Sequence, residues 1–298
     1  MRGRWKYLFA ALLLINSLAF AQLPDNYQSL SAEEKQSLLW SEVTQSHKLD
    51  PLPKLTENSF KQLLITIKGF FNLKPSFDHE ADELPQGRAK ILHSNGSVGR
   101  ITFLARNDHP FTGIYKTGAV GIARLSLAMP SSDTSFVPGM AVKFLIDNRP
   151  SVNIHAINSL EGQGADWNFF AMDFSNKIEH PSGKILRAIE LIFEWTHDPA
   201  NELGLWRLAA WNRDGQPAGI PIYPERIYFK PASNVQNLIA ADSRDDFRSS
   251  LLLVSVGPLY ELYGLYHGNE YHIGTIMLES ELLASQYGDN YLFFQHQR

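Results

Sequence analysis

The amino-acid sequence predicts an α+β protein, in which a helical N-terminal part is followed by one long β-rich unit. Apolar residues recur at helical spacing between Ser31 and about Phe71, whereas after Lys90 the chain breaks into short β-rich runs bounded by Gly, Pro, Asn and Asp. No internal repeat, low-complexity segment or Pro- or Gly-rich linker divides the chain. We therefore expect one main β domain.

The first residues have the three regions of a cleavable signal peptide. Basic residues precede an apolar run from Tyr7 to Phe20, and small residues end the segment at Ala21. The apolar run is shorter than the roughly 20 residues that cross a bilayer, which argues against a membrane anchor. We expect a signal peptide over 1–21, a mature protein that begins at Gln22, and a periplasmic or secreted location.

The composition limits the possible functions. The chain has no cysteine, which excludes thiol catalysis, thiolate metal sites and a lipid-modified N-terminal cysteine. Its net charge is −4, with 27 basic and 31 acidic residues, and no basic run is interleaved with aromatic residues. Neither nucleic acid nor an anionic membrane is therefore indicated as a partner, and stability must come from packing, to which 44% hydrophobic residues contribute.

The N-terminal part predicts two helices. Ser31 precedes Glu34 as in a capping box, and apolar residues follow at helical spacing. Pro51 and Pro53 interrupt the pattern, which then resumes over residues 60–70.

The β-rich part begins with seven candidate strands. They are Val98–Arg106, Val120–Ala128, Met140–Asp147, Val152–Asn158, Ile185–Trp195, Trp206–Asn212 and Tyr223–Lys230. Several alternate only loosely between apolar and polar residues, which is typical of strands covered on both faces. A closed barrel and a helix-backed sheet both satisfy this pattern.

The C-terminal part predicts a helix, or a helix followed by a strand, over Asp242–Val256. A hairpin follows, with strands at Tyr260–Tyr266 and Tyr271–Glu279 around the turn residues His267-Gly268-Asn269. For the tail, Glu281–Arg298, we expect a helix and then an extended end.

Four common site motifs have little support. Gly162-Gln163-Gly164 lacks the third glycine and the following helix of a dinucleotide loop. His267 and His272 lack a third zinc ligand in a recognisable pattern, which favours surface polar residues over a zinc site. Asn95-Gly96-Ser97 is a formal glycosylation sequon, and no serine lies in a G-x-S-x-G elbow.

A series of short motifs begins at Lys90. They are Lys90-Ile91-Leu92-His93, Gly99-Arg100-Ile101-Thr102-Phe103, Gly121-Ile122-Ala123-Arg124-Leu125-Ser126, Pro138-Gly139-Met140-Ala141-Val142-Lys143-Phe144, Leu160-Glu161-Gly162-Gln163, Phe169-Phe170, the stretch from Trp195 to Pro199, Ile273-Gly274-Thr275-Ile276-Met277-Leu278 and Tyr291-Leu292-Phe293-Phe294. In this order and spacing they resemble the haem catalase superfamily, whose corresponding motifs include R-V-V-H, V-R-F-S, R-G-x-A-x-K-F, L-V-G-N and F-W-x-x-x-P. The resemblance extends from about Leu84 to the C-terminus.

The resemblance implies a catalase-like antiparallel β-barrel with N-terminal and flanking helices. The barrel domain would occupy residues 84–298, after a helical segment over 22–83. It also implies haem as the cofactor and hydrogen peroxide or an organic hydroperoxide as the substrate.

The resemblance assigns a role to five residues. His93 matches the histidine that moves a proton between the two oxygens of peroxide, and Ser126 matches the hydroxyl that orients it. Gln163 takes the place of the asparagine that hydrogen-bonds peroxide. Arg124 and Lys90 match basic residues that pair with the haem propionates, although Lys90 lacks the bidentate fork of the family's arginine.

The chain departs from the family on the proximal side of the haem. Catalases bind the iron through a tyrosinate in an R-x-x-x-Y helix, and no such motif occurs after the signal peptide. His296 in the tail is a possible substitute ligand, and the metal ligand remains open. Besides an enzyme, we therefore consider two other interpretations. One is a barrel that binds haem or another apolar ligand without turnover, and the other is a degenerate barrel with a structural or interaction role.

Overall fold

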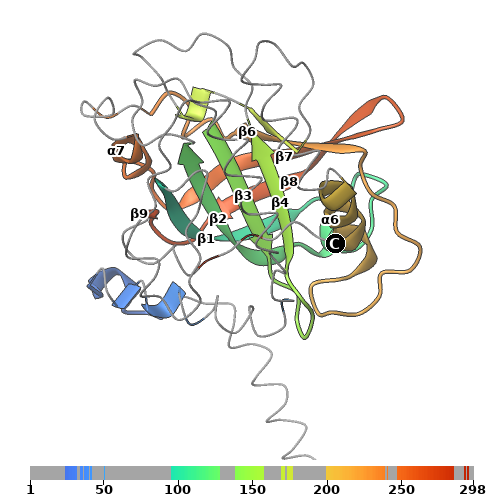
Figure 1. The fold of residues 1–298 in the computed structure, drawn as a ribbon, viewed down its shortest axis with the longest axis horizontal. Coiled ribbons are helices and arrows are strands. Elements are labelled where there is room, and N and C mark those ends of the chain that lie inside the picture. The colour runs from blue at the N-terminus through green and yellow to red at the C-terminus, as the bar shows by residue number, and fades with distance from the viewer. Residues whose placement is uncertain are drawn as a thin grey trace, which may run out of the picture.

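The computed structural model describes most of the β-rich part of the chain. The described residues are 24–31, 34–35, 37–39, 41, 50, 95–127, 138–157, 169–171, 173–176, 199–238, 240, 247–284, 292 and 294. The signal peptide, the second predicted helix and the predicted boundary between residues 83 and 84 lie outside them. Figure 1 shows the described strands wrapped around a common interior.

Eight antiparallel strands close into a barrel. Each strand pairs with the next along the chain, and β1 closes the barrel because it pairs with both β2 and β8. The strands are β1 (Asn95–Ala105), β2 (Ala119–Leu127), β3 (Pro138–Phe144), β4 (Val152–Ile157), β5 (Phe174–Ser175), β6 (Arg226–Pro231), β7 (Gly257–Tyr266) and β8 (Asn269–Leu278). Of the two arrangements that the strand pattern allowed, the closed barrel is the correct one.

Strand β1 has two partners on the side away from β2. Its second half pairs with β8, from Ile101 opposite Leu278 to Ala105 opposite Gly274, and its first half pairs with the short strand β9 (Leu283–Ala284). The structure therefore corrects the helix expected after Glu281, because Leu283 and Ala284 are extended.

Most of the predicted strands are confirmed within a few residues. Predictions for β1 to β4, for β6 and for both strands of the hairpin are correct, whereas Ile185–Trp195 lies outside the described residues. Trp206–Asn212 is wrong as a strand, because residues through Ala210 belong to helix α6 (Pro199–Ala210). Proline is well suited to the first turn of a helix, and Pro199 begins α6.

The predicted hairpin turn has the backbone that its sequence favours. His267 and Gly268 have φ angles of 50° and 76°, the left-handed values that a tight turn between β7 and β8 requires. Glycine adopts such a φ angle without a steric cost, which explains its place in the turn.

The helices outside the barrel are short, apart from α6. They are η1 (Tyr27–Ser29), α4 (Ile114–Thr117), η4 (Phe169–Ala171) and α7 (Arg248–Leu251). The helix predicted over Asp242–Val256 is limited, among the described residues, to α7. The capping box is confirmed: the Ser31 amide donates to Glu34 Oε2 at 2.8 Å, and the Glu34 amide donates to Ser31 Oγ at 3.3 Å.

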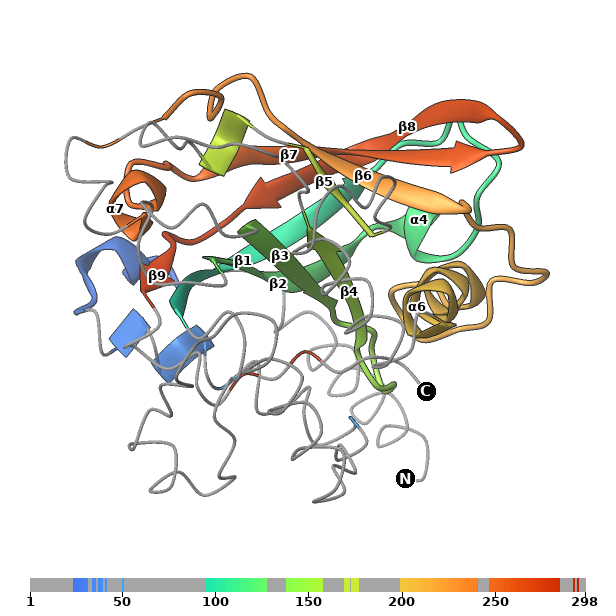
Figure 2. The ribbon, with the colours of Figure 1, turned by 45° about the horizontal axis from the view of Figure 1, so that its top comes forward.

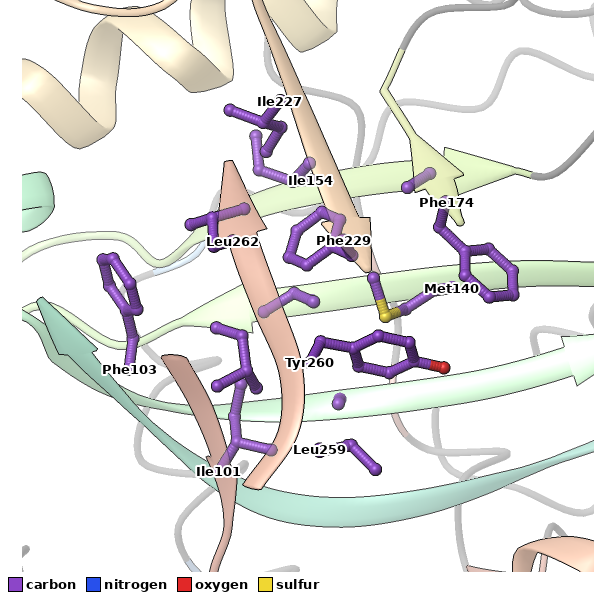
Figure 3. Packing of buried hydrophobic residues seen from close by; sticks show 14 of the residues in the cluster. Ile101, Phe103, Met140, Ile154, Phe174, Ile227, Phe229, Leu259, Tyr260 and Leu262 are labelled. Carbon is purple, nitrogen blue, oxygen red and sulfur yellow. The ribbon is translucent and has the colours of Figure 1, made fainter. Parts of the chain in front are cut away.

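The barrel interior is filled by apolar side chains. Figure 3 shows Phe174, Phe229, Tyr260 and Met140 converging from β5, β6, β7 and β3. Tyr260 is completely buried, its pKa is raised well above the ordinary value by burial, and its hydroxyl has no hydrogen-bond partner among the described residues. The interior is a packed core, since these rings contact one another at centroid distances of 5.9 and 6.4 Å.

The outside of the barrel has two contrasting faces, which lie on opposite sides in Figure 2. The covered face consists of buried outward residues of β1 to β4: Gly96, Val98, Arg100, Ile122, Arg124, Ser126, Gly139, Lys143 and Asn153. The open face consists of exposed or partly exposed outward residues of β6 to β8: Tyr228, Lys230, Glu261, Tyr263, Glu270, His272, Thr275 and Met277.

Candidate functional site

Strand β2 places two of the predicted site residues on the covered face. Side chains alternate across a strand, so Arg124 and Ser126 point outward while Ala123 and Leu125 point into the core. Arg124 and Ser126 are each only 4% exposed. A polar pair this deeply buried on the outside of a barrel needs other parts of the protein around it.

The Arg124 side chain lies against Gly96, the second residue of β1. A Cβ atom added to Gly96 would be 2.9 Å from Arg124 Cζ and 2.7 Å from the Leu125 carbonyl oxygen. Only a glycine therefore lets the guanidinium lie so close to the β1 backbone.

Small residues continue from Gly96 across the neighbouring strands. Gly96 is opposite Ser126, and Ser126 is opposite Gly139, so three adjacent strands present nothing larger than a hydroxymethyl group. The Ser126 hydroxyl donates to the Gly139 carbonyl oxygen at 3.4 Å. The result is a flat strip of barrel surface with Arg124 at its border.

The other three predicted site residues, Lys90, His93 and Gln163, lie outside the described residues. The sequence places His93 two residues before Asn95, where β1 begins, and three before Gly96. The predicted contact between His93 and Ser126 stays a prediction.

Two further polar residues of the covered side were missed by the sequence analysis. Asn153 is 2% exposed and lies opposite Lys143, while the partly buried His155 lies opposite Ala141, which itself pairs with Arg124. The alternation Val152-Asn153-Ile154-His155 was a signal that both polar side chains point away from the core.

The covered face carries three cationic side chains. Besides Arg124, they are Arg100, whose Nε lies 3.8 Å from a Glu279 carboxylate oxygen, and Lys143, whose ammonium lies 2.7 Å from Asp50 Oδ2. Burial lowers the pKa of Lys143, and the Asp50 carboxylate opposes that shift.

The open face has a separate polar cluster. Glu261 accepts hydrogen bonds from His272 Nε2 at 2.7 Å and from the Thr275 hydroxyl at 2.9 Å. The His272 ring stacks on Tyr263 at 4.8 Å between centroids, and Lys230 Nζ lies 4.1 Å from the centre of the Tyr263 ring. The polar and aromatic groups of this cluster contact one another, so no ligand is needed to account for their arrangement.

Each histidine considered for zinc has an acidic neighbour among the described residues. His267 Nδ1 lies 3.7 Å from Glu225, and His272 contacts Glu261. In the described part of the chain, no group of three or more His, Asp or Glu residues is arranged to hold a metal ion. Two members of the glycosylation sequon, Gly96 and Ser97, are buried within β1.

The fold and the covered face together define a class of protein: a closed antiparallel β-barrel with a buried, partly cationic patch on its outer surface. No family model, no curated protein and no solved structure matches the chain. No described helix is long and apolar enough to span a membrane.

Proposed function

We propose that the chain is an exported, catalase-like haem protein that acts on hydrogen peroxide or an organic hydroperoxide. One observation carries the proposal: Arg124 and Ser126 lie buried on the same face of β2, and Arg124 packs against the strand that follows His93. The motif order and the eight-stranded antiparallel barrel are consistent with a catalase-like α+β domain over residues 84–298.

Two features of the described residues support the proposal of a haem site. A buried guanidinium can form paired hydrogen bonds with a carboxylate, and the haem propionates are carboxylates. The strip formed by Gly96, Ser126 and Gly139 lets a flat macrocycle approach the barrel backbone closely. Bound haem would supply the iron chemistry that cleaves peroxide.

The side chains of the chain would handle the proton and the substrate. In this proposal His93 accepts a proton from one peroxide oxygen and returns it to the other, for which an imidazole is suited because its ordinary pKa is near neutrality. Ser126 orients that imidazole. Gln163 is the predicted amide that holds peroxide, and Asn153 is a second amide that the covered face itself provides.

We expect turnover to be slow. A tyrosinate ligand stabilises the high oxidation states of iron, and the sequence after residue 21 contains no R-x-x-x-Y motif. The alternative is a barrel that binds haem or another ligand without turnover.

Haemin titration followed by a peroxide assay tests the proposal. We expect a haem absorbance band, a peroxide reaction that His93→Ala slows by about 10²–10⁴-fold, and weaker haemin binding in Arg124→Lys. Arg226→Lys is the matched control, because Arg226 is a similarly buried outward arginine at the start of β6. The mass of the exported protein should correspond to a chain that begins at Gln22.

The possible results separate the three interpretations. A haem band without a peroxide reaction would favour the interpretation as a haem-binding protein over the interpretation as an enzyme. No band at all, or equal weakening in the two arginine variants, would overturn the haem site and favour a structural or interaction role.

A further inference from the structure

A buried ion pair connects the covered face to a distant residue of the N-terminal part. Asp50 Oδ2 accepts a hydrogen bond from Lys143 Nζ at 2.7 Å, although the two residues are 93 positions apart. The Lys143 side chain is 0% exposed and that of Asp50 is 3% exposed. Both charged groups are shielded from water, so the ion pair between them helps to stabilise each charge.

Ser151 completes this ion pair. Its backbone amide donates to Asp50 Oδ1 at 2.7 Å, and its hydroxyl lies 2.8 Å from both carboxylate oxygens and from Lys143 Nζ. The Asp50 carboxylate is thus held from two sides, by β3 through Lys143 and by the residue that precedes β4. Such a contact fixes the position of Asp50 on the barrel.

A small apolar cluster covers the same face. Val98 and Ile122 are buried together with Leu292, and Leu39 and Phe294 pack against them. Both ends of the chain therefore supply side chains to one patch of β1 and β2. We call Leu39, Asp50, Leu292 and Phe294 the clasp.

The two parts of the clasp meet at Lys143. Its Nζ lies 6.0 Å from the centre of the Phe294 ring, and Lys143 is directly opposite Ile122 on β2. Arg124 is directly opposite Val98 and is a diagonal neighbour of Lys143, about 7–8 Å away by sheet geometry. The clasp consequently lies beside the residue that borders the strip of small side chains.

We propose that the clasp controls access to the covered face and that the ion pair between Asp50 and Lys143 holds it closed. A buried charge that loses its partner is destabilised until it regains water, so loss of either partner of this ion pair favours opening. Opening removes the carboxylate that pairs with Lys143, and an anionic ligand such as another carboxylate can then take its place. This control of access does not depend on haem, because it rests on contacts within the chain.

Thiol labelling can measure the opening, since the chain has no cysteine of its own. Val98→Cys places a thiol under the clasp, Met277→Cys places one on the open face, and Ala123→Cys places one in the core. Each is labelled with N-ethylmaleimide, a neutral reagent, in the full mature chain with and without Asp50→Asn, and the labelling rate is followed by mass spectrometry.

We expect Asp50→Asn to raise the labelling rate of Val98→Cys at least about tenfold, with little change for the other two thiols. Ser151→Ala, which keeps the ion pair, should give a smaller increase and replaces Asp50→Asn if that variant does not fold. An unchanged rate for Val98→Cys would overturn the proposal. An equal increase for Ala123→Cys would also overturn it, because the whole barrel would then be opening. No haem is present in this experiment, so its result is independent of the proposed function.

Discussion

The covered and open faces belong to the same barrel, yet they stabilise their charges in different ways. On the open face, Lys230 and Glu270 are 34% and 47% exposed and lie 3.0 Å apart, so water screens their attraction. On the covered face, Lys143 and Asp50 lie 2.7 Å apart and are almost completely buried. Because the two distances are similar, we expect the difference in burial to decide how much each ion pair contributes to stability.

The two faces also differ in where their partners come from. His272 and Glu261 are 11 positions apart and belong to one hairpin. Lys143 depends on Asp50, which is 93 positions away and outside the barrel. The polar cluster of the open face can therefore form with its own strands, whereas Lys143 on the covered face is paired only when Asp50 is in place.

A double-mutant cycle gives the largest expected difference between the faces. Lys143→Met and Asp50→Asn should each lower the free energy of unfolding by about 3 kcal/mol, because each leaves one buried charge without its partner. The double variant should lose clearly less than the sum, by about 1–3 kcal/mol. Urea unfolding followed by circular dichroism measures all four proteins.

The matched cycle uses Lys230→Met and Glu270→Gln on the open face. There the coupling should stay below about 1 kcal/mol, since exposed pairs gain little. Equal coupling energies on the two faces would show that burial does not distinguish them.

A glycine substitution tests how tightly the covered face is packed. Gly96→Ala should lower the free energy of unfolding by about 1–3 kcal/mol, because the new methyl group would lie 2.7 Å from the Leu125 carbonyl oxygen. It should also displace the Arg124 guanidinium, which lies 2.9 Å from that position, and so weaken haemin binding. Thermal unfolding and haemin titration provide the two measurements.

Gly99→Ala, three residues further along β1, is the control. Its methyl group would come too close to the flexible ends of Leu278 and Leu282, at 2.7 and 2.9 Å, which can move aside. The nearest backbone atom from another part of the chain, the Glu281 carbonyl oxygen, would be at an ordinary 3.6 Å. If Gly99→Ala costs as much stability as Gly96→Ala and weakens haemin equally, Arg124 is not held in the way described.

Local sequence patterns were sufficient to predict most of the barrel. The β7–β8 hairpin follows from two apolar runs and a turn that contains glycine, and all three signals lie within a few residues of one another. Trp206–Asn212 was predicted wrongly because its apolar and aromatic residues suit a strand as well as a buried helix. The helix was indicated only by Pro199, several residues upstream.

The candidate site was predictable only where it depends on neighbours along the chain. Arg124 and Ser126 share a face because they are two positions apart in a strand. The position of Asn153 relative to Lys143 depends on the register between β3 and β4, which a single sequence does not specify. Asp50 was missed because nothing near it in the sequence indicates a partner 93 residues away.

The smallest expected effect concerns the connection between β1 and β2, which belongs to neither face. His109 is 6% exposed in this connection, and its ring bonds require the neutral form: the Phe111 amide donates to Nδ1 at 3.2 Å, while Nε2 lies 3.0 Å from the Tyr115 carbonyl oxygen. Burial, with Lys116 nearby, lowers the pKa of His109 below its ordinary value of 6.5. Between these two pKa values the unfolded chain binds the proton more readily, so the free energy of unfolding rises with pH.

The contribution of His109 is therefore complete above about pH 6.5 and is lost as the pH falls through the lowered pKa of the folded protein. We expect His109→Gln, which cannot titrate, to flatten the loss of stability between about pH 7 and pH 5 by less than about 1 kcal/mol. Urea unfolding at both pH values measures the difference, and the same pair of proteins at about pH 8 is the control, where the stability gap between them should no longer change with pH. If the wild type and His109→Gln lose the same stability on acidification, the acid sensitivity of the barrel comes from titratable groups other than His109.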